Sequence, residues 1–176
     1  TGKLSETGCA KGPRIQLRPK PMNRTEDRQA RMRQRYDRLT QAPAEFFGEH
    51  VHHGYWIESR DILAAQRALI AKLADFAGVA RGARVLDVGC ATGGSARWLA
   101  QNLDCSVLGI SISEQEIAAA TNKAGVAGLA DRLEFRVMDA TQLQLPAASC
   151  EGGWVLERGE RLAGKESPPT ERERRR

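Results

Sequence analysis

Residues 85–100, VLDVGCATGGSARWLA, join a short apolar run, a glycine-rich turn and a helix-forming segment without a gap. The apolar run at 85–88 is typical of a strand that is buried on both faces. Three glycines interrupt the run, and the spacing of residues 95–101 predicts a helix. A strand, a tight turn and a helix in this order are typical of a parallel α/β sheet, which binds small ligands at the carboxyl edge of its strands.

The residues inside this turn indicate which ligand the sheet edge favours. A dinucleotide fingerprint, G-x-G-x-x-G, has its second glycine where this chain has Ala91. Asp87, two residues before Gly89, would place a carboxylate where a pyrophosphate must lie, and the two charges would repel. S-adenosylmethionine fits better, because its amino group can bind Asp87 and its carboxylate suits the N-terminus of a helix. The sequence therefore favours S-adenosylmethionine over NAD.

The same turn resembles motif I, D-x-G-x-G-x-G, of the class I S-adenosylmethionine-dependent methyltransferases. Ala91 is the departure, since the motif has glycine there. The resemblance implies a Rossmann-like, doubly wound α/β sheet, preceded here by N-terminal helices and incomplete after its first four strands. It also implies that the turn binds the cofactor through Asp87, Gly89, Cys90, Ala91, Gly93 and Gly94.

The segment after the second predicted strand, 106–110, resembles the variant found in tocopherol, sterol and cyclopropane-forming enzymes. Residues 110–115 read ISISEQ, and residues 110–113 lack the acid that many members of the class carry at the end of this strand. In that subgroup a hydroxyl and an amide contact the adenosyl part, which implies this role for Ser111 and Gln115. The alternative is that both are turn and cap residues of the helix predicted over 114–124, whose capping box is Ser113-x-x-Glu116.

A third strand is predicted at 133–137, where apolar and polar residues alternate. Asp139 and Ala140 follow at its carboxyl end, where motif II of the family places an acid near the adenine amino group. A carboxylate can accept a hydrogen bond from that exocyclic amine. A surface turn aspartate is the alternative interpretation.

Before the sheet, residues 45–56, EFFGEHVHHGYW, concentrate histidines and aromatic residues. The histidines lack a recognised zinc spacing, which disfavours a metal site. The segment resembles the G-E-H-x-H-H-G-Y stretch of tocopherol methyltransferases, which lies near the cofactor. His53 and Tyr55 are therefore expected to form a lid or substrate edge, with plain aromatic packing as the alternative. Tyr36, before this segment, is expected at the same edge.

The end of the resemblance lies between residues 142 and 165. A loop and a fourth strand are expected over 142–156, weakened by glycines at 152 and 153. The next stretch resembles E-S-G-E-H-M-x-D-K, which implies that Glu157 and Glu160 lie at the active-site edge and orient or deprotonate the substrate. We expect the chain to be truncated here, because the family has further strands after this point.

The chain of 176 residues suits one domain. We expect a disordered leader at 1–23, an N-terminal helix and lid segment at 24–60, the cofactor-binding domain at 61–165 and a disordered tail at 166–176. The net charge of +5 gathers at the arginine-rich ends, where intermixed acids disfavour a nucleic-acid partner. Four scattered cysteines and no apolar run of membrane-spanning length indicate a cytoplasmic protein without a disulfide framework.

Together these features predict methyl transfer from S-adenosylmethionine to a small lipidic, prenylated or aromatic acceptor, impaired by truncation. The alternatives are a fragment that binds the cofactor without catalysis and a dinucleotide-binding Rossmann protein.

Overall fold

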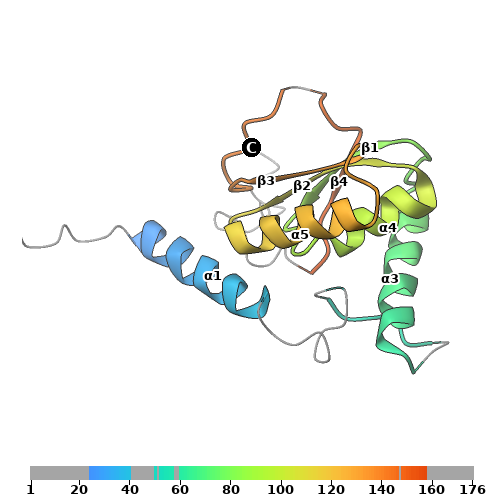
Figure 1. The fold of residues 1–176 in the computed structure, drawn as a ribbon, viewed down its shortest axis with the longest axis horizontal. Helices are drawn as coiled ribbons and strands as arrows, with labels where there is room; N and C mark the ends of the chain where they lie inside the picture. The colour runs from blue at the N-terminus through green and yellow to red at the C-terminus, as the bar shows by residue number, and fades with distance from the viewer. Residues whose placement is uncertain (1–23, 41–49, 51, 58–59, 147, 158–176) are drawn as a thin grey trace, which may run out of the picture.

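The computed structural model describes residues 24–40, 50, 52–57, 60–146 and 148–157 (Figure 1). The predicted leader and tail lie outside these residues. None of the helices described is long and apolar enough to span a membrane. The elements are α1 (Arg24–Thr40), α3 (Ile62–Phe76), β1 (Arg84–Val88), α4 (Gly94–Leu103), β2 (Ser106–Ser111), α5 (Glu114–Val126), β3 (Leu133–Val137) and β4 (Gly152–Trp154).

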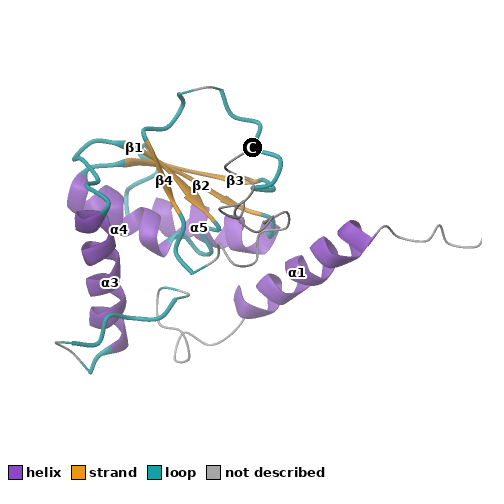
Figure 2. Cartoon of the chain, turned by 180° about the vertical axis from the view of Figure 1, so that it is seen from behind, coloured by secondary structure: helices purple, strands orange, loops and turns teal. Residues whose placement is uncertain are grey.

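The four strands form one parallel sheet in the order β3-β2-β1-β4. Helices α4 and α5 lie on one face, with α3 beside α4, and the loop between β3 and β4 passes over the other face (Figures 1 and 2). Beneath that loop runs a groove of about 600 Å³, bordered by Val107 and Leu145. The predicted α/β class and its doubly wound connectivity are confirmed.

The core lies between the sheet and the three helices that cover it. Ile70 of α3, Leu99 of α4 and Trp154 of β4 are buried there with Val85 and Val107 of the two central strands. Burying apolar area is the main favourable term in folding, and these side chains supply it on the helical face. Strand β4, which contains Gly152 and Gly153, is only three residues long.

The strand order places a switch point beside β1. The chain runs outward from β1 through β2 to β3, and then returns to pair β4 with the opposite side of β1. In open α/β sheets such a reversal leaves a crevice outside the carboxyl ends of the strands, where ligands bind. The turn that follows β1 lies at this crevice.

The turn and β3 lie close together because two residues at this contact, Gly93 and Gly109, have no side chain. The ring of Phe135 in β3 fills the space beside Gly109. A Cβ added at Gly109 would lie 2.5 Å from Cδ1 of Phe135 and 3.0 Å from Cβ of Cys90. A Cβ at Gly93 would also meet this ring, at 2.8 Å from Cζ. Glycines at both positions allow Phe135 to pack directly under the turn.

Replacing Gly109 with alanine should therefore lower the free energy of unfolding by about 1 to 3 kcal/mol, because the added methyl overpacks this contact. The matched control is Gly152→Ala, where the added methyl would have no neighbouring atom within 4 Å. Urea denaturation of both variants measures the difference. Equal stabilities for the two variants would contradict the packing described.

Candidate functional site

The glycine turn is attached to the neighbouring strand through one carbonyl. The backbone N–H groups of Gly89 and Cys90 both donate to the carbonyl oxygen of Ile110, at 2.9 and 3.1 Å. The N–H of Gly93 then donates to the Cys90 carbonyl at 2.9 Å, which closes the turn before α4 begins. The turn is thereby held over the end of β2.

Three residues of the turn adopt left-handed backbone conformations. Gly89 and Gly93 have φ values of 76° and 74°, which glycine tolerates at little cost. Ala91 has φ 49°, where its Cβ crowds the backbone. The departure from the motif glycine therefore falls on a position whose backbone favours glycine.

Asp87 is the acid nearest this turn, and its side chain is only 2% exposed. It occupies the last part of β1, paired in register with Gly109 on one side and Trp154 on the other. A carboxylate at such a buried position favours a cationic partner, because a charge in a low dielectric gains more from an opposite charge than it would in water.

The histidine-rich segment lies over the turn because α3 holds it there. Gln66 is fully buried, and its Nε2 donates to the carbonyl oxygens of His50 and His52 at 2.6 and 2.7 Å. The Tyr55 N–H donates to the Ala65 carbonyl at 2.8 Å. A Cβ at Gly54 would lie 2.5 Å from that of Ala65, so glycine permits the close contact. Tyr55 itself faces α3, with Lys72 Nζ 5.4 Å from its ring centre.

A cavity of about 20 Å³ remains between this segment and the turn. Asp87 and the turn residues line it together with His50, His52 and Leu156. The rings of His50 and His52 lie 5.3 Å apart. The cavity brings an acid predicted from the sequence together with two histidines that were not predicted as site residues.

His53 points away from this cavity, and its side chain is 90% exposed. Its ring nitrogen Nδ1 lies 2.7 Å from Glu157 Oε2, and its backbone N–H donates to the same oxygen at 3.1 Å. Partial burial opposes ionisation of Glu157, but the hydrogen bonds from His53 outweigh it and lower the pKa of this carboxyl. The contact joins the histidine-rich segment to Glu157, three residues after the end of β4.

The hydroxyl of Ser111 is already committed within the protein. It donates to Glu116 Oε2 at 2.6 Å and accepts from the Ser113 N–H at 3.2 Å. The predicted capping box is half formed, since Ser113 Oγ accepts from the Glu116 N–H while the Glu116 carboxylate turns to Ser111. Glu116 is buried, whereas Gln115 is exposed at the start of α5.

Helix α1 lies along the carboxyl ends of β2 and β3. Gln29 Nε2 donates to Asp139 Oδ2 at 2.5 Å, and Arg33 Nε donates to the Ile112 carbonyl at 3.0 Å. Asp139 Oδ1 accepts from both the N–H and the hydroxyl of Thr141. The half-buried Asp139 and Ala140 thus lie at this edge, and a carboxylate keeps lone pairs for a further donor.

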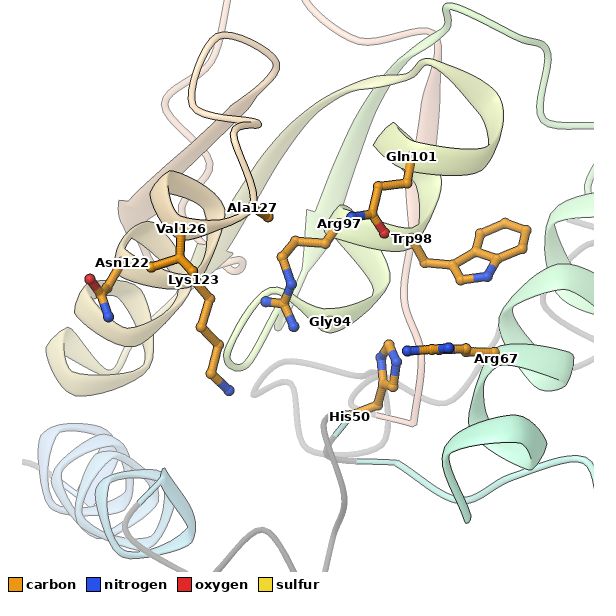
Figure 3. A pocket seen from close by; sticks show the side chains of 10 residues that line it. All are labelled: His50, Arg67, Gly94, Arg97, Trp98, Gln101, Asn122, Lys123, Val126 and Ala127. Carbon is orange, nitrogen blue, oxygen red and sulfur yellow. The ribbon is translucent and has the colours of Figure 1, made fainter. Parts of the chain in front are cut away.

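A second cavity, of about 360 Å³, lies on the helical side of the turn (Figure 3). Figure 3 shows Arg97 from α4 and Lys123 from α5 extending into the same space. Arg97 Nη1 donates to the Thr92 carbonyl at 2.7 Å, and Lys123 Nζ donates to the Thr92 hydroxyl at 3.1 Å. These two cationic side chains hold the turn through Thr92, from the side that faces α4 and α5.

The structure therefore gathers the predicted turn residues at one edge, with Ser111 and Asp139 at the ends of adjacent strands. Tyr36 is buried in α1, and the second predicted acid, Glu160, lies outside the described residues. Within the described ranges, no group of three His, Cys, Asp or Glu side chains is placed to hold a metal ion. The sequence pattern did not predict that Gln66 holds the histidine-rich segment or that His52 lines the cavity. The adjacent histidines next to Gly54 were the signal that could have indicated His52.

The strained conformation at Ala91 gives a stability prediction. Ala91→Gly should raise the free energy of unfolding by about 0.5 to 1 kcal/mol, because it removes the Cβ from a left-handed residue. The control Ala96→Gly, in the interior of α4, should lower it by about 1 kcal/mol. Thermal or urea unfolding measures both, and a loss of stability in Ala91→Gly would contradict the conformation.

The contact between His53 and Glu157 gives a pH-dependent prediction. Because the folded protein keeps Glu157 ionised to lower pH than the unfolded chain does, the contact stabilises above the ordinary carboxyl pKa. That stability is lost as the pH falls through the lowered pKa. A double-mutant cycle of His53→Ala and Glu157→Gln should give a coupling of up to about 1 kcal/mol at pH about 7. The coupling should vanish in acid, and zero coupling at neutral pH would refute the contact.

The sequence of this chain is similar to that of known methyltransferases. Residues 85–159 match a methyltransferase domain family. The 27-O-demethylrifamycin SV methyltransferase of Amycolatopsis mediterranei (strain S699) is 38% identical over 123 residues, covering 69% of this chain and 45% of that protein. The chloroplastic tocopherol O-methyltransferase of Arabidopsis thaliana is 30% identical over 134 residues, covering 69% and 38%. The chain spans less than half the length of these curated relatives.

Solved structures agree with this match. The [4+2]-cyclase SpnF is 31% identical, with a TM-score of 0.64 over 70% of this chain and 47% of that one. A geranyl diphosphate methyltransferase, solved with GPP and sinefungin, shares the fold at 19% identity, with a TM-score of 0.63 over 73% and 55% of the two chains. The domain match and the curated relatives also agree with the predicted cofactor, S-adenosyl-L-methionine. On the glycine turn, the sheet order and these similarities, the chain belongs to the class I S-adenosyl-L-methionine-dependent methyltransferases.

Proposed function

We propose that this chain provides the donor-binding part of an enzyme that transfers a methyl group from S-adenosyl-L-methionine to an oxygen of a small hydrophobic acceptor. The observation that carries the proposal is the buried Asp87 beside a turn of small residues at the switch point of the sheet. Two curated relatives support the acceptor class, since one acts on a demethylrifamycin and the other is a tocopherol O-methyltransferase.

The residues at the edge fit the donor in charge and in shape. Asp87 would bind the amino group, and the turn from Gly89 to Gly94 would admit the ligand close to its backbone. Asp139 would accept from the adenine amine, and the exposed Gln115 at the start of α5 would contact the ribose. Ser111 would contribute through its link to Glu116, because its own proton is donated there.

When bound, the donor supplies an electrophilic methyl group for in-line attack by the acceptor. The chain's residues would mainly position the two reactants and exclude water from between them. Glu157 lies after β4 on the same edge, and its lowered pKa keeps it an anion at neutral pH. Together with the exposed His53, it would orient the acceptor or receive its proton. Glu160 is proposed for the same edge from the resemblance.

A second function, binding of the cofactor without methyl transfer, is favoured by one observation. A solved structure with 31% identity is named as a [4+2]-cyclase, which is a reaction other than methyl transfer. A dinucleotide-binding function is disfavoured by the carboxylate of Asp87 beside the turn. The three alternatives differ in the ligand that the chain holds and in whether it is turned over.

Isothermal titration with S-adenosylhomocysteine tests the proposed donor site. Asp87→Asn should weaken binding about tenfold or more, because it removes a charge-assisted hydrogen bond to the amino group. The control Asp131→Asn changes an exposed aspartate before β3 and should leave affinity within about twofold. Tighter binding of NAD than of S-adenosylhomocysteine, or equal affinities for Asp87→Asn and the unchanged protein, would refute the proposal.

A further inference from the structure

His52 contributes to the small cavity a ring nitrogen that accepts no hydrogen bond from the described residues. It is the buried Nε2 of His52, a residue that lines the same cavity as Asp87. The other ring nitrogen, Nδ1, lies 2.5 Å from the carbonyl oxygen of His53. A carbonyl can only accept, so Nδ1 carries the proton and Nε2 presents a lone pair.

The surroundings keep this imidazole neutral. Burial lowers the pKa of His52 and outweighs the opposing effects of the His53 carbonyl and of Glu157. Gln66 fixes the backbone on both sides of the intervening residue, through the carbonyls of His50 and His52. The lone pair therefore has a defined place, set by α3 rather than by the exposed end of the segment.

A buried acceptor of this kind calls for an N–H or O–H donor, because leaving it unsatisfied costs about 1 to 3 kcal/mol. The cavity of about 20 Å³ has room for one group of the size of a water molecule. An ammonium group has nearly that size, bears three donors and suits the carboxylate of Asp87, which lines the same cavity. A water molecule meets the size requirement but not the charge.

We infer that His52 Nε2 is a binding group for the amino end of the methyl donor, which it holds together with Asp87. The inference rests on the proposed function and adds a residue of the histidine-rich segment to the donor site. Gln66 is then a positioning residue, since it acts by holding the His52 backbone. The exposed His53 has a different role, in contact with Glu157.

Two ligands separate this contact from a general effect on the site. S-adenosylhomocysteine carries the amino acid end, whereas 5′-methylthioadenosine has the same nucleoside and lacks that end. His52→Leu keeps bulk but removes the acceptor, and should weaken S-adenosylhomocysteine about tenfold while leaving methylthioadenosine within about twofold. His52→Gln offers a carbonyl oxygen near the Nε2 position and should recover most of the loss. The control Ile57→Ala, at a residue 72% exposed directly after the segment, should change neither affinity.

The outcomes distinguish the inference from the proposed function. If the unchanged protein binds S-adenosylhomocysteine but His52→Leu binds it equally well, the inference fails and the donor site stands. If His52→Leu loses both ligands to the same extent, His52 only supports the fold of the site, and the inference fails in that way. If the unchanged protein binds neither ligand, the proposed function itself fails.

Discussion

The carbonyl oxygen of Ile110 holds the site together, because it accepts the N–H groups of both Gly89 and Cys90. These two hydrogen bonds extend the pairing of β1 and β2 past the end of β1 and fix where the turn begins. Phe135 packs beneath the turn where Gly93 and Gly109 leave space. The position of the turn is therefore set by its main-chain hydrogen bonds to β2 and by the packing of Phe135 against the two glycines.

Several parts of the chain that are distant in sequence meet on this turn. Thr92 accepts hydrogen bonds from Arg97 and Lys123 on the helical side. On the other side, Gln66 of α3 positions the histidine-rich segment over Asp87. The helices thus stabilise the fold and also determine which groups face the carboxyl edge of the sheet.

Much of this fold could be predicted from the sequence, because periodicity and glycine placement act locally. The run at 85–88, the glycine turn and the following helix occur where the pattern predicts them. Family resemblance supplied the cofactor and most candidate ligands. Their spatial arrangement along the carboxyl edge follows from parallel strands ending at one side.

The rest of the site depends on tertiary contacts that no local pattern specifies. Adjacent histidines at 52 and 53 look equivalent in the sequence, but only the contact with Gln66, fourteen residues away, decides which one lies inside. Likewise, Ser111 donates to Glu116 rather than presenting its proton outward. In the sequence, alanine in place of the motif glycine at position 91 looks conservative. The structure shows that this residue has a left-handed backbone, where the alanine Cβ is unfavourable.

The most direct measurement is the set of backbone amide chemical shifts of the ¹⁵N-labelled chain, recorded with and without S-adenosylhomocysteine. If the donor binds at the carboxyl edge, the largest changes will fall on Gly89, Cys90 and Gly93, followed by the amides near Ser111 and Asp139. Changes centred on the cavity beside Arg97 and Lys123, with the turn unaffected, would contradict the assignment of the donor site.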